Sequence, residues 1–392
     1  MRSVIPAGRV PVLLARWGIV LVRVALVLIV FGELYVTATV QRPDLMHPSA
    51  IGTDTSNYYA AGQRLNAGHD LYGPLRATDR RVPGYPGTYP DPLLSPPLVA
   101  VVWRPLAALG PRSMTIWWAT NLALVVFIAI WFATVGRRLT LAGVLGILAL
   151  GLPIALVLAV PYRYLGYHSP ISIAALSGNL NGYLVGLCIL AWWASSRGRS
   201  WLAGSAAACA AVLKLGPFVI LWWLVVRRDW PAVKAFVATV VVLGIVGLVG
   251  AGLDANVAFA RLTLSAAVSP SSLSIPWILH KWLGVEPHLA NIGTIVVTVV
   301  GLAAVYALRR DARASYLLTI VVVIFCSPVV LVGNFALLLA AVAPWEVPGR
   351  IGAITGQGDA DDEAVPADAP RWGGVAGRAL ATAAGPGVEV PA

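Results

Sequence analysis

Residues 114–135 read MTIWWATNLALVVFIAIWFATV and contain no charged side chain. About 20 consecutive apolar residues are enough for an α-helix to cross the hydrocarbon core of a bilayer. Stretches of this character recur along the chain, which is 58% hydrophobic and only 11% charged, whereas a soluble domain carries about 25% charged residues. The sequence therefore predicts an all-α, polytopic integral membrane protein and excludes a soluble globular one.

Apolar stretches bounded by charge, proline or glycine predict about nine transmembrane helices, within a range of about eight to ten. The expected spans are 12–38, 92–109, 114–135, 139–160, 178–195, 201–226, 232–252, 289–308 and 315–343. Two of them are interrupted, by Gly151-Leu152-Pro153 and by Ser327-Pro328. Either is a candidate for a broken or re-entrant element that lines a cavity.

The net charge of +11 comes mainly from arginines in short loops, a distribution that indicates membrane orientation and not nucleic-acid binding. With a cytoplasmic N-terminus and alternating spans, the long polar segments 40–91 and 253–288 lie together on the outer face, where we expect them to cover a cavity. The same alternation places Arg104, Arg112, Arg163, Arg227, Arg228, Arg309, Arg310 and Arg313 inside and only Arg137, Arg138, Arg197 and Arg199 outside.

Asp54 begins a polar part of the first long segment, and Tyr58 follows it at i+4. Residues so spaced share one face of a helix, so a short helix here would place a carboxylate and an aromatic ring together at the membrane surface. Such a carboxylate can act as a general base that takes the proton from a sugar hydroxyl. The structural alternative is that Asp54 or Thr53 caps the helix. The rings of Tyr58 and Tyr89 are candidates for stacking against a sugar.

Lys214 lies in the middle of the apolar stretch 201–226, where a charged side chain costs roughly 2.5–3.5 kcal/mol on insertion scales. Such a residue indicates function, and its natural partner is an anion such as a lipid phosphate. It can alternatively snorkel or meet backbone carbonyls near Pro217. Asn179 and Asn181 flank the start of a predicted helix, where they can hydrogen-bond either a sugar or another helix. Paired tryptophans at 117–118, 192–193 and 222–223 are expected at the membrane interface.

Several short motifs occur in a fixed order along most of residues 12–345. They are Asp-x-x-x-Tyr-x-x-Ala at 54–61, Leu71-Tyr72, Tyr89-Pro90, Gly178-Asn179-Leu180-Asn181, Lys214-Leu215-Gly216-Pro217 and Ser271-Ser272-Leu273. Together they resemble the polyprenyl-phosphate-mannose-dependent mannosyltransferases of glycosyltransferase family 87, integral-membrane enzymes of the GT-C class found in mycobacteria and their relatives.

The resemblance implies a GT-C-like fold with Asp54 as the catalytic base in the first outer loop. The family's Ser-Pro-x-Ser-Trp-x-His-His motif begins here at Ser327-Pro328, but neither histidine is present and Asn334 offers only neutral hydrogen bonds. The expected substrate-binding residues are Tyr58, Tyr89, Asn179, Asn181, Lys214, Ser272 and Asn334.

The implied reaction transfers a mannosyl or other hexosyl group, with inversion, from a polyprenyl phosphate to a cell-envelope glycan or glycolipid at the extracytoplasmic face of the cell membrane. Asp54 would deprotonate the acceptor, and Lys214 or a loop arginine would neutralise the departing phosphate. The sequence has no glycine-rich phosphate loop and no His-Glu-x-x-His motif, so we expect neither a metal nor a cofactor. Two alternatives stay open: a lipid or glycolipid transporter, and a catalytically degenerate scaffold of envelope assembly.

The composition changes near Trp345, which divides the chain into a predicted transmembrane glycosyltransferase-like domain, 1–345, and a predicted disordered tail, 346–392. The tail has too few apolar side chains to offset the entropy of ordering it. Deleting it should leave membrane insertion and the midpoint temperature of unfolding nearly unchanged, as measured by thermal denaturation of the purified protein. A large loss of stability would show that the tail docks on the helical domain.

Overall fold

The computed structural model describes residues 53–72, 95–135, 170–265, 274–327 and 332–346, together with Val330 and six positions between Leu21 and Tyr35. All regular structure within these residues is helical, in agreement with the predicted fold class. Apart from those six positions and Glu346, the predicted spans 12–38 and 139–160 and the predicted tail 346–392 lie outside the described residues.

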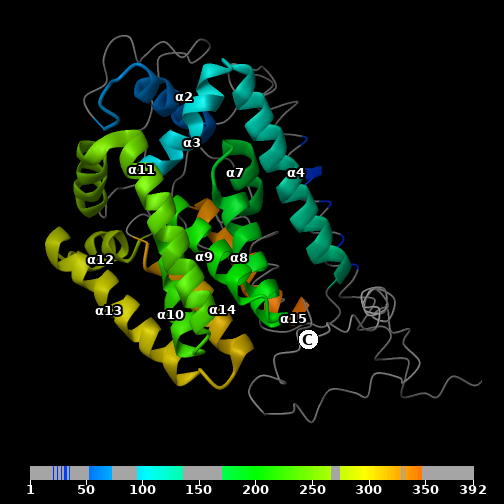
Figure 1. Ribbon diagram of the computed structural model, residues 1–392. Helices are drawn as coiled ribbons and strands as arrows, with labels where there is room; N and C mark the ends of the chain where they lie inside the picture. The colour runs from blue at the N-terminus through cyan, green and yellow to red at the C-terminus, as the bar shows by residue number, and fades with distance from the viewer. Residues whose placement is uncertain are drawn as a thin grey trace, which may run out of the picture. The chain divides into compact units, whose positions relative to one another are not determined.

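Figure 1 shows the described helices in their order along the chain. They are α2 (Thr53–Asn66), α3 (Pro97–Ala108), α4 (Arg112–Val135), α7 (Pro170–Ser177), α8 (Asn181–Ser196), α9 (Ser200–Leu213), the 3-10 helix η4 (Gly216–Phe218), α10 (Val219–Val226), α11 (Trp230–Ser265), α12 (Ile275–Leu283), α13 (Pro287–Ala307), α14 (Ala312–Phe325), the 3-10 helix η6 (Val332–Leu337) and α15 (Leu338–Glu346).

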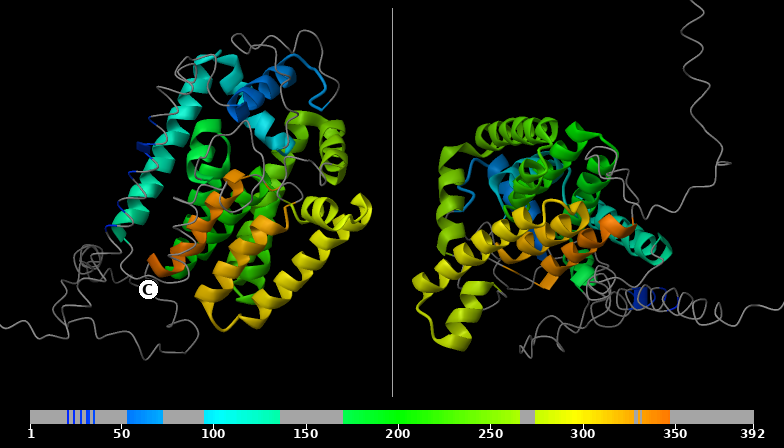
Figure 2. Two further views of the ribbon diagram at one scale, coloured as in Figure 1. Left: turned by 180° about the vertical axis from the view of Figure 1, so that it is seen from behind. Right: turned by 90° about the horizontal axis from the view of Figure 1, so that it is seen from below.

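Among the described residues, α11 supplies the one helix long and apolar enough to cross a membrane, over Trp230–Thr263. It exposes large apolar side chains along its length, and α13 exposes Leu289, Ile292, Val296 and Val299 at helical spacing. Figure 2 shows α13 and α4 at opposite sides of the helices in both views. Such exposed apolar faces are expected where helices contact lipid, so these helices have the character of a helical membrane protein.

The predicted span 92–109 is wrong as a membrane crossing. Its helix, α3, has 12 residues and a length of about 18 Å, against about 30 Å of hydrocarbon. Near its C-terminal end the Arg104 carbonyl accepts a hydrogen bond from Asn66 Nδ2 (2.9 Å), and Arg104 Nε donates to Asn66 Oδ1 (3.1 Å). Because Asn66 ends α2, the end of α3 lies on the same side as α2 and not across the membrane from it.

The predicted span 201–226 is also not a single crossing but a helical hairpin, α9–η4–α10. A side chain at Gly204 would collide with the carbonyl of Ala232, and the Thr239 hydroxyl is hydrogen-bonded to Ser205 Oγ at 3.1 Å. The first turns of α9 therefore lie against the first turns of α11. The other end of the hairpin, α10, joins the same end of α11 through only three residues. The segment thus enters and leaves at one end.

Proline chemistry explains where this hairpin turns. Pro217 has no N–H to donate to the carbonyl of Leu213, four residues earlier, and its ring would clash there. Accordingly, α9 ends at Leu213 and Lys214 is extended, with φ −155° and ψ 131°. The predicted interruption at Ser327-Pro328 is confirmed, because α14 ends at Phe325 and helix resumes only at η6.

The segment after this second break turns back along α14. Phe325 at the end of α14 contacts Phe335 in η6, with ring centroids 6.1 Å apart, and α15 then packs against both α14 and α8. The predicted span 315–343 is therefore a second helix–break–helix unit.

Because the segment 201–226 is a hairpin, cations gather at one end of the helices. The α8–α9, α10–α11 and α13–α14 turns meet there, because α9 begins beside α11 and Arg227 lies close enough to Asp311 for their charges to interact. The prediction that Arg197 and Arg199 lie across the membrane from Arg227 is therefore wrong. These turns carry Arg197, Arg199, Arg227, Arg228, Arg309 and Arg310.

The predicted polar loop 253–288 is mostly helical. Beyond a kink at Gly252, α11 continues to Ser265, and α12 occupies Ile275–Leu283. The ring of Phe259 in this segment lies 6.0 Å from that of Tyr72, which follows α2. The segments 40–91 and 253–288 therefore contact one another at this point.

The hairpin makes a test of sidedness possible. In a background without Cys188, Cys209 and Cys326, single cysteines in place of the exposed Arg199 and Arg228 should be labelled by an impermeant thiol reagent from the same side of the membrane. A cysteine in place of Asp254, beyond the kink in α11, should be labelled from the other side. Labelling of positions 199 and 228 from opposite sides would instead support a single membrane crossing at 201–226.

Candidate functional site

The turn between α7 and α8, Gly178-Asn179-Leu180, is the point on which several helices converge. Gly178 has φ +63°, a conformation that glycine adopts without a Cβ clash. Its carbonyl accepts hydrogen bonds from Trp117 Nε1 of α4 (2.9 Å) and from Thr55 Oγ1 of α2 (3.3 Å). A Cβ at this position would overlap Thr55 Oγ1. Glycine is thus required by both the turn and the approach of α2.

Tyr58, one helical turn further along, secures α2 against the same turn. Its ring lies 6.2 Å from that of Trp103 and 6.3 Å from that of Trp117, and its hydroxyl hydrogen-bonds with the Ser95 side chain and the backbone of Leu180. Burial, and to a smaller extent the Asp54 carboxylate, raise the pKa of this hydroxyl well above its usual value. Tyr58 is therefore a neutral, structural phenol at physiological pH.

Asp54 lies in the first turn of α2, which begins at Thr53. It is therefore not the N-cap residue, although a carboxylate in a first turn still interacts favourably with the helix dipole. Its side chain is half-buried. The carboxylate lies close enough to interact electrostatically with both Tyr58 and Lys214. A residue of the first predicted loop and a residue of the hairpin tip thus belong to one site.

Lys214 is held at the hairpin tip by two asparagines from other parts of the chain. Its Nζ donates to Asn334 Oδ1 at 2.6 Å and to Asn181 Oδ1 at 3.2 Å. Asn181 Nδ2 in turn donates to Asn334 Oδ1 at 3.3 Å. Both asparagines are 2% exposed, whereas Lys214 is partly exposed. The start of α8, the α9–η4 break and η6 therefore meet at one ammonium group.

The partners of Lys214 decide between the alternatives for its role. Its hydrogen bonds end on side-chain amide oxygens and not on backbone carbonyls near Pro217. Within the ranges that the structure describes, no carboxylate hydrogen-bonds to the ammonium. Neutral amides stabilise the charge through their dipoles but do not cancel it. The site therefore retains a positive charge that an anion can neutralise.

The structure brings together five of the predicted site residues. Asn179 belongs with the others because its Oδ1 accepts from the Asn181 N–H at 2.8 Å, which shapes the start of α8. Tyr58 is close to them, but Trp103 and Trp117 cover its ring, so it is not available for stacking on a sugar. Tyr89 and Ser272 lie outside the described residues. The five are Asp54, Asn179, Asn181, Lys214 and Asn334.

Sequence reasoning missed Thr55, Ser95 and the internal role of Trp117. The prediction of an interfacial belt is wrong for Trp117, which hydrogen-bonds to the site turn, and for Trp192 and Trp223, which are 1% and 0% exposed. A tryptophan near the end of an apolar stretch has the same sequence signal whether it faces lipid headgroups or a neighbouring helix.

The described residues contain no group of three or more His, Cys, Asp and Glu side chains arranged to hold a metal ion. The polar groups gathered at the site are one carboxylate, one ammonium and side-chain amides. This set can take up a proton, neutralise an anion and hydrogen-bond to hydroxyl groups.

These observations define a class of protein. It is a helical protein of membrane character that holds a carboxylate and an ammonium in one polar site. A model of glycosyltransferase family 87 matches residues 94–345. The chain therefore belongs to glycosyltransferase family 87, as the sequence motifs predict, and is a transferase. Comparisons with curated proteins and with solved structures found no match.

The matched region contains Asn181, Lys214 and Asn334 but begins after α2. The relation of Asp54 to the rest of the site is therefore given by the tertiary contacts of Thr55 and Tyr58.

The shared ammonium predicts that the effects of Asn334 and Lys214 on stability are coupled. Asn334→Leu leaves Lys214 short of an acceptor and should lower the free energy of unfolding by about 1–3 kcal/mol. In the Lys214→Met background the same substitution should cost clearly less, because no buried charge then depends on the amide. The double-mutant cycle is measured by denaturant titration in detergent micelles. Additive losses would show that Asn334 acts through packing alone.

Proposed function

We propose that this protein transfers a hexosyl group, with mannosyl favoured by the sequence motifs, from a polyprenyl phosphate to a glycan or glycolipid acceptor, with inversion at the anomeric carbon. The observation that carries the proposal is the Lys214 ammonium, which is held by two neutral amides within electrostatic range of the Asp54 carboxylate. Inverting transfer from a sugar phosphate needs these two groups, a base and a cation for the phosphate.

Lys214 is the group suited to the lipid-linked phosphate. An ammonium that is hydrogen-bonded to neutral amides stabilises an arriving anion, because within the described residues no hydrogen-bonded ion pair has to be broken first. The charge on the phosphate grows as the bond to the sugar breaks. An ammonium already in position therefore favours the transition state over the ground state.

Asp54 is the group suited to the acceptor. As the acceptor oxygen forms its bond to the anomeric carbon, the bond from that carbon to the phosphate oxygen breaks. The proton of the acceptor hydroxyl passes to the Asp54 carboxylate, and the polyprenyl phosphate leaves with the bonding electron pair. Asn179 and Asn181 lie at the turn between these two groups, where their amides can hydrogen-bond to sugar hydroxyls.

The distribution of cations supports an extracytoplasmic site in a multi-pass protein of the cell membrane. Arg197, Arg199, Arg227, Arg228 and Arg309 share the end of the helices away from α2. Loops rich in arginine stay on the cytoplasmic side. This orientation directs α2 and Asp54 to the outer face, where lipid-linked sugars are used.

Replacing Asp54 by Asn tests the mechanism. The variant keeps the size of the side chain but cannot accept a proton, so transfer from a polyprenyl-phosphate hexose should fall by about 10²–10⁴-fold, while the protein folds and retains the donor. Asp70→Asn, at an exposed aspartate just after α2, is the matched control and should leave transfer unchanged. The measurement is radiolabelled sugar transfer by purified protein in liposomes.

A purely structural Asp54 predicts a different result. Asn would then cost only the helix-dipole interaction, about 0.3–1 kcal/mol of stability, and transfer would persist. Full activity of Asp54→Asn would therefore reject the base. Absence of transfer by the wild type with every hexosyl lipid would instead favour the scaffold, and vectorial movement of unreacted lipid would favour the transporter.

A further inference from the structure

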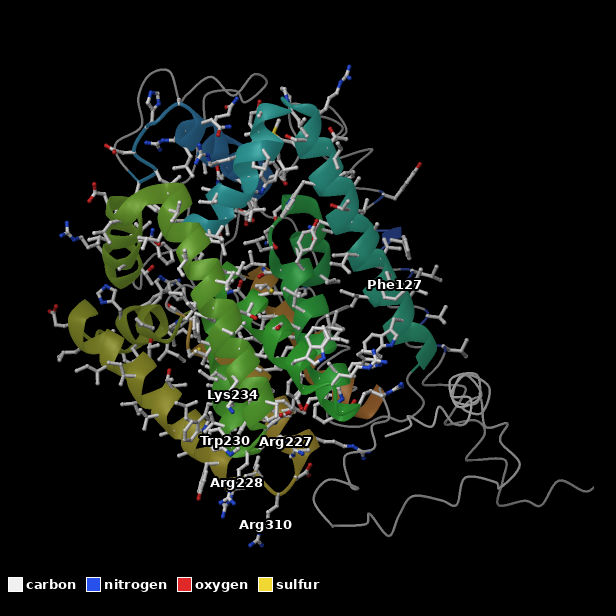
Figure 3. The ribbon with its side chains drawn as sticks, in the orientation of Figure 1. Phe127, Arg227, Arg228, Trp230, Lys234 and Arg310 are labelled. Atoms are coloured by element: carbon white, nitrogen blue, oxygen red, sulfur yellow. The ribbon has the colours of Figure 1, made fainter. Side chains whose placement is uncertain are left out.

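A second charged feature lies at the end of the helices away from α2, where the α10–α11 and α13–α14 turns meet. Trp222 Nε1 of α10 donates to the Leu302 carbonyl of α13 at 3.0 Å, and the Arg227 guanidinium interacts electrostatically with Asp311. Figure 3 shows Arg227, Arg228 and Arg310 together at this end. We call this group the basic end cluster. Its cations are Arg227, Arg228, Lys234, Arg309, Arg310 and Arg313.

Both carboxylates of the cluster accept backbone hydrogen bonds at the starts of helices. Asp229 Oδ1 accepts the Ala232 N–H at 3.3 Å in the first turn of α11. Asp311 caps α14, where its Oδ1 accepts the N–H groups of Arg313 (2.8 Å) and Ala314 (3.0 Å). Six cations against these two carboxylates leave a net charge of +4. The cluster thus carries a surplus of positive charge.

Not all of the cations share this surplus equally. Arg227 interacts electrostatically with both carboxylates. Arg309 stacks on the Tyr306 ring, 4.2 Å from its centroid, and donates to the Tyr306 carbonyl. Arg228, Arg310 and Arg313 are exposed, and within the described residues their guanidinium groups have no hydrogen-bond acceptor. Their side-chain donors are therefore free for a ligand.

The backbone at Arg228 is unusual. Arg228 has φ +58° and is the one non-glycine residue of the described chain with positive φ. It ends α10 in a Schellman motif, in which its own N–H bonds to Val225 O and that of Asp229 to Leu224 O. The ends of α2 and α8 use the same pair of bonds, but there Gly68 and Gly198 occupy the left-handed position.

An arginine at a position that favours glycine carries backbone strain. Strain of this kind is often stored at functional sites, where the side chain is needed for another purpose. Within the described residues the Arg228 side chain makes no hydrogen bond and no cation–π contact that would stabilise the turn. It is therefore a candidate for binding a ligand.

The surroundings of the cluster identify the chemistry of a partner. Trp230, Tyr306 and Leu308 beside it are 54%, 49% and 40% exposed, and the exposed apolar face of α11 begins with Val237. Cations and aromatics that border an apolar face are placed at the depth of lipid headgroups. We propose that the basic end cluster binds anionic phospholipid headgroups, with Arg228, Arg310 and Arg313 contacting their phosphate groups.

The test uses the full-length protein in detergent, titrated with phosphatidylglycerol or with zwitterionic phosphatidylcholine, and bound lipid is counted by native mass spectrometry. The wild type should bind phosphatidylglycerol more tightly, and Arg310→Gln and Arg313→Gln should each weaken this binding by about fivefold. Arg112→Gln, at an exposed arginine that begins α4, is the matched control and should bind as the wild type does.

Arg228→Gly separates binding from folding. It should weaken phosphatidylglycerol binding by about fivefold and yet raise the midpoint temperature of unfolding without lipid, because glycine relieves the left-handed strain. Equal binding of the two lipids by the wild type, or undiminished phosphatidylglycerol binding by Arg228→Gly, would overturn the proposal. If Arg228→Gly does not fold, the argument from backbone strain fails. Undiminished phosphatidylglycerol binding by both Arg310→Gln and Arg313→Gln would reject the basic end cluster as the lipid-binding site.

Discussion

A charged side chain within an apolar sequence must be met by oxygen atoms, and Lys214 imposes this constraint on the whole site. The ammonium lacks hydrogen-bond acceptors on its own segment, because Pro217 ends the helix and the last residue of α9 is Leu213, directly before Lys214. Asn181 and Asn334, from segments far away in the sequence, supply the oxygens. The start of α8, the hairpin tip and η6 are thereby fixed to one another around one charge, and the neutral character of both partners leaves that charge available.

The turn at Gly178 extends this arrangement to α2. Its carbonyl joins α2 to α4, and Leu180 in the same turn contacts Tyr58. Asp54 is thus placed at the site by the contacts of its neighbours Thr55 and Tyr58 in α2. The Asn334 amide accepts from Lys214 without adding a second titrating group beside it.

The pairing of α3 with α2 and the hairpin α9–η4–α10 change which side of the membrane each arginine is assigned to. With α3 paired to α2 and α9–α10 turning back, the arginines at 197–199, 227–228 and 309–310 all lie at one end. A strict alternation of spans had divided them between two sides. The arrangement also moves Arg104 and Arg112, which were predicted inside, to the side of α2, so that prediction is wrong for these two residues. The arginines gathered at the other end agree with the positive-inside rule for a cytoplasmic face. The same end carries the strained Arg228, so orientation and lipid contact can share one set of residues.

The sequence by itself determined the helical membrane class, the family motifs and the residues able to carry charge or proton transfer, since hydropathy, proline and side-chain chemistry are local properties. It also located the break at Ser327-Pro328. It did not distinguish a crossing from a hairpin at 201–226, because an apolar stretch has the same composition whether its ends lie on one side or on two. Only the tertiary structure brought Asp54, Asn181, Lys214 and Asn334 together, because the contacts that join them span from 33 to 153 residues and depend on packing of separate helices.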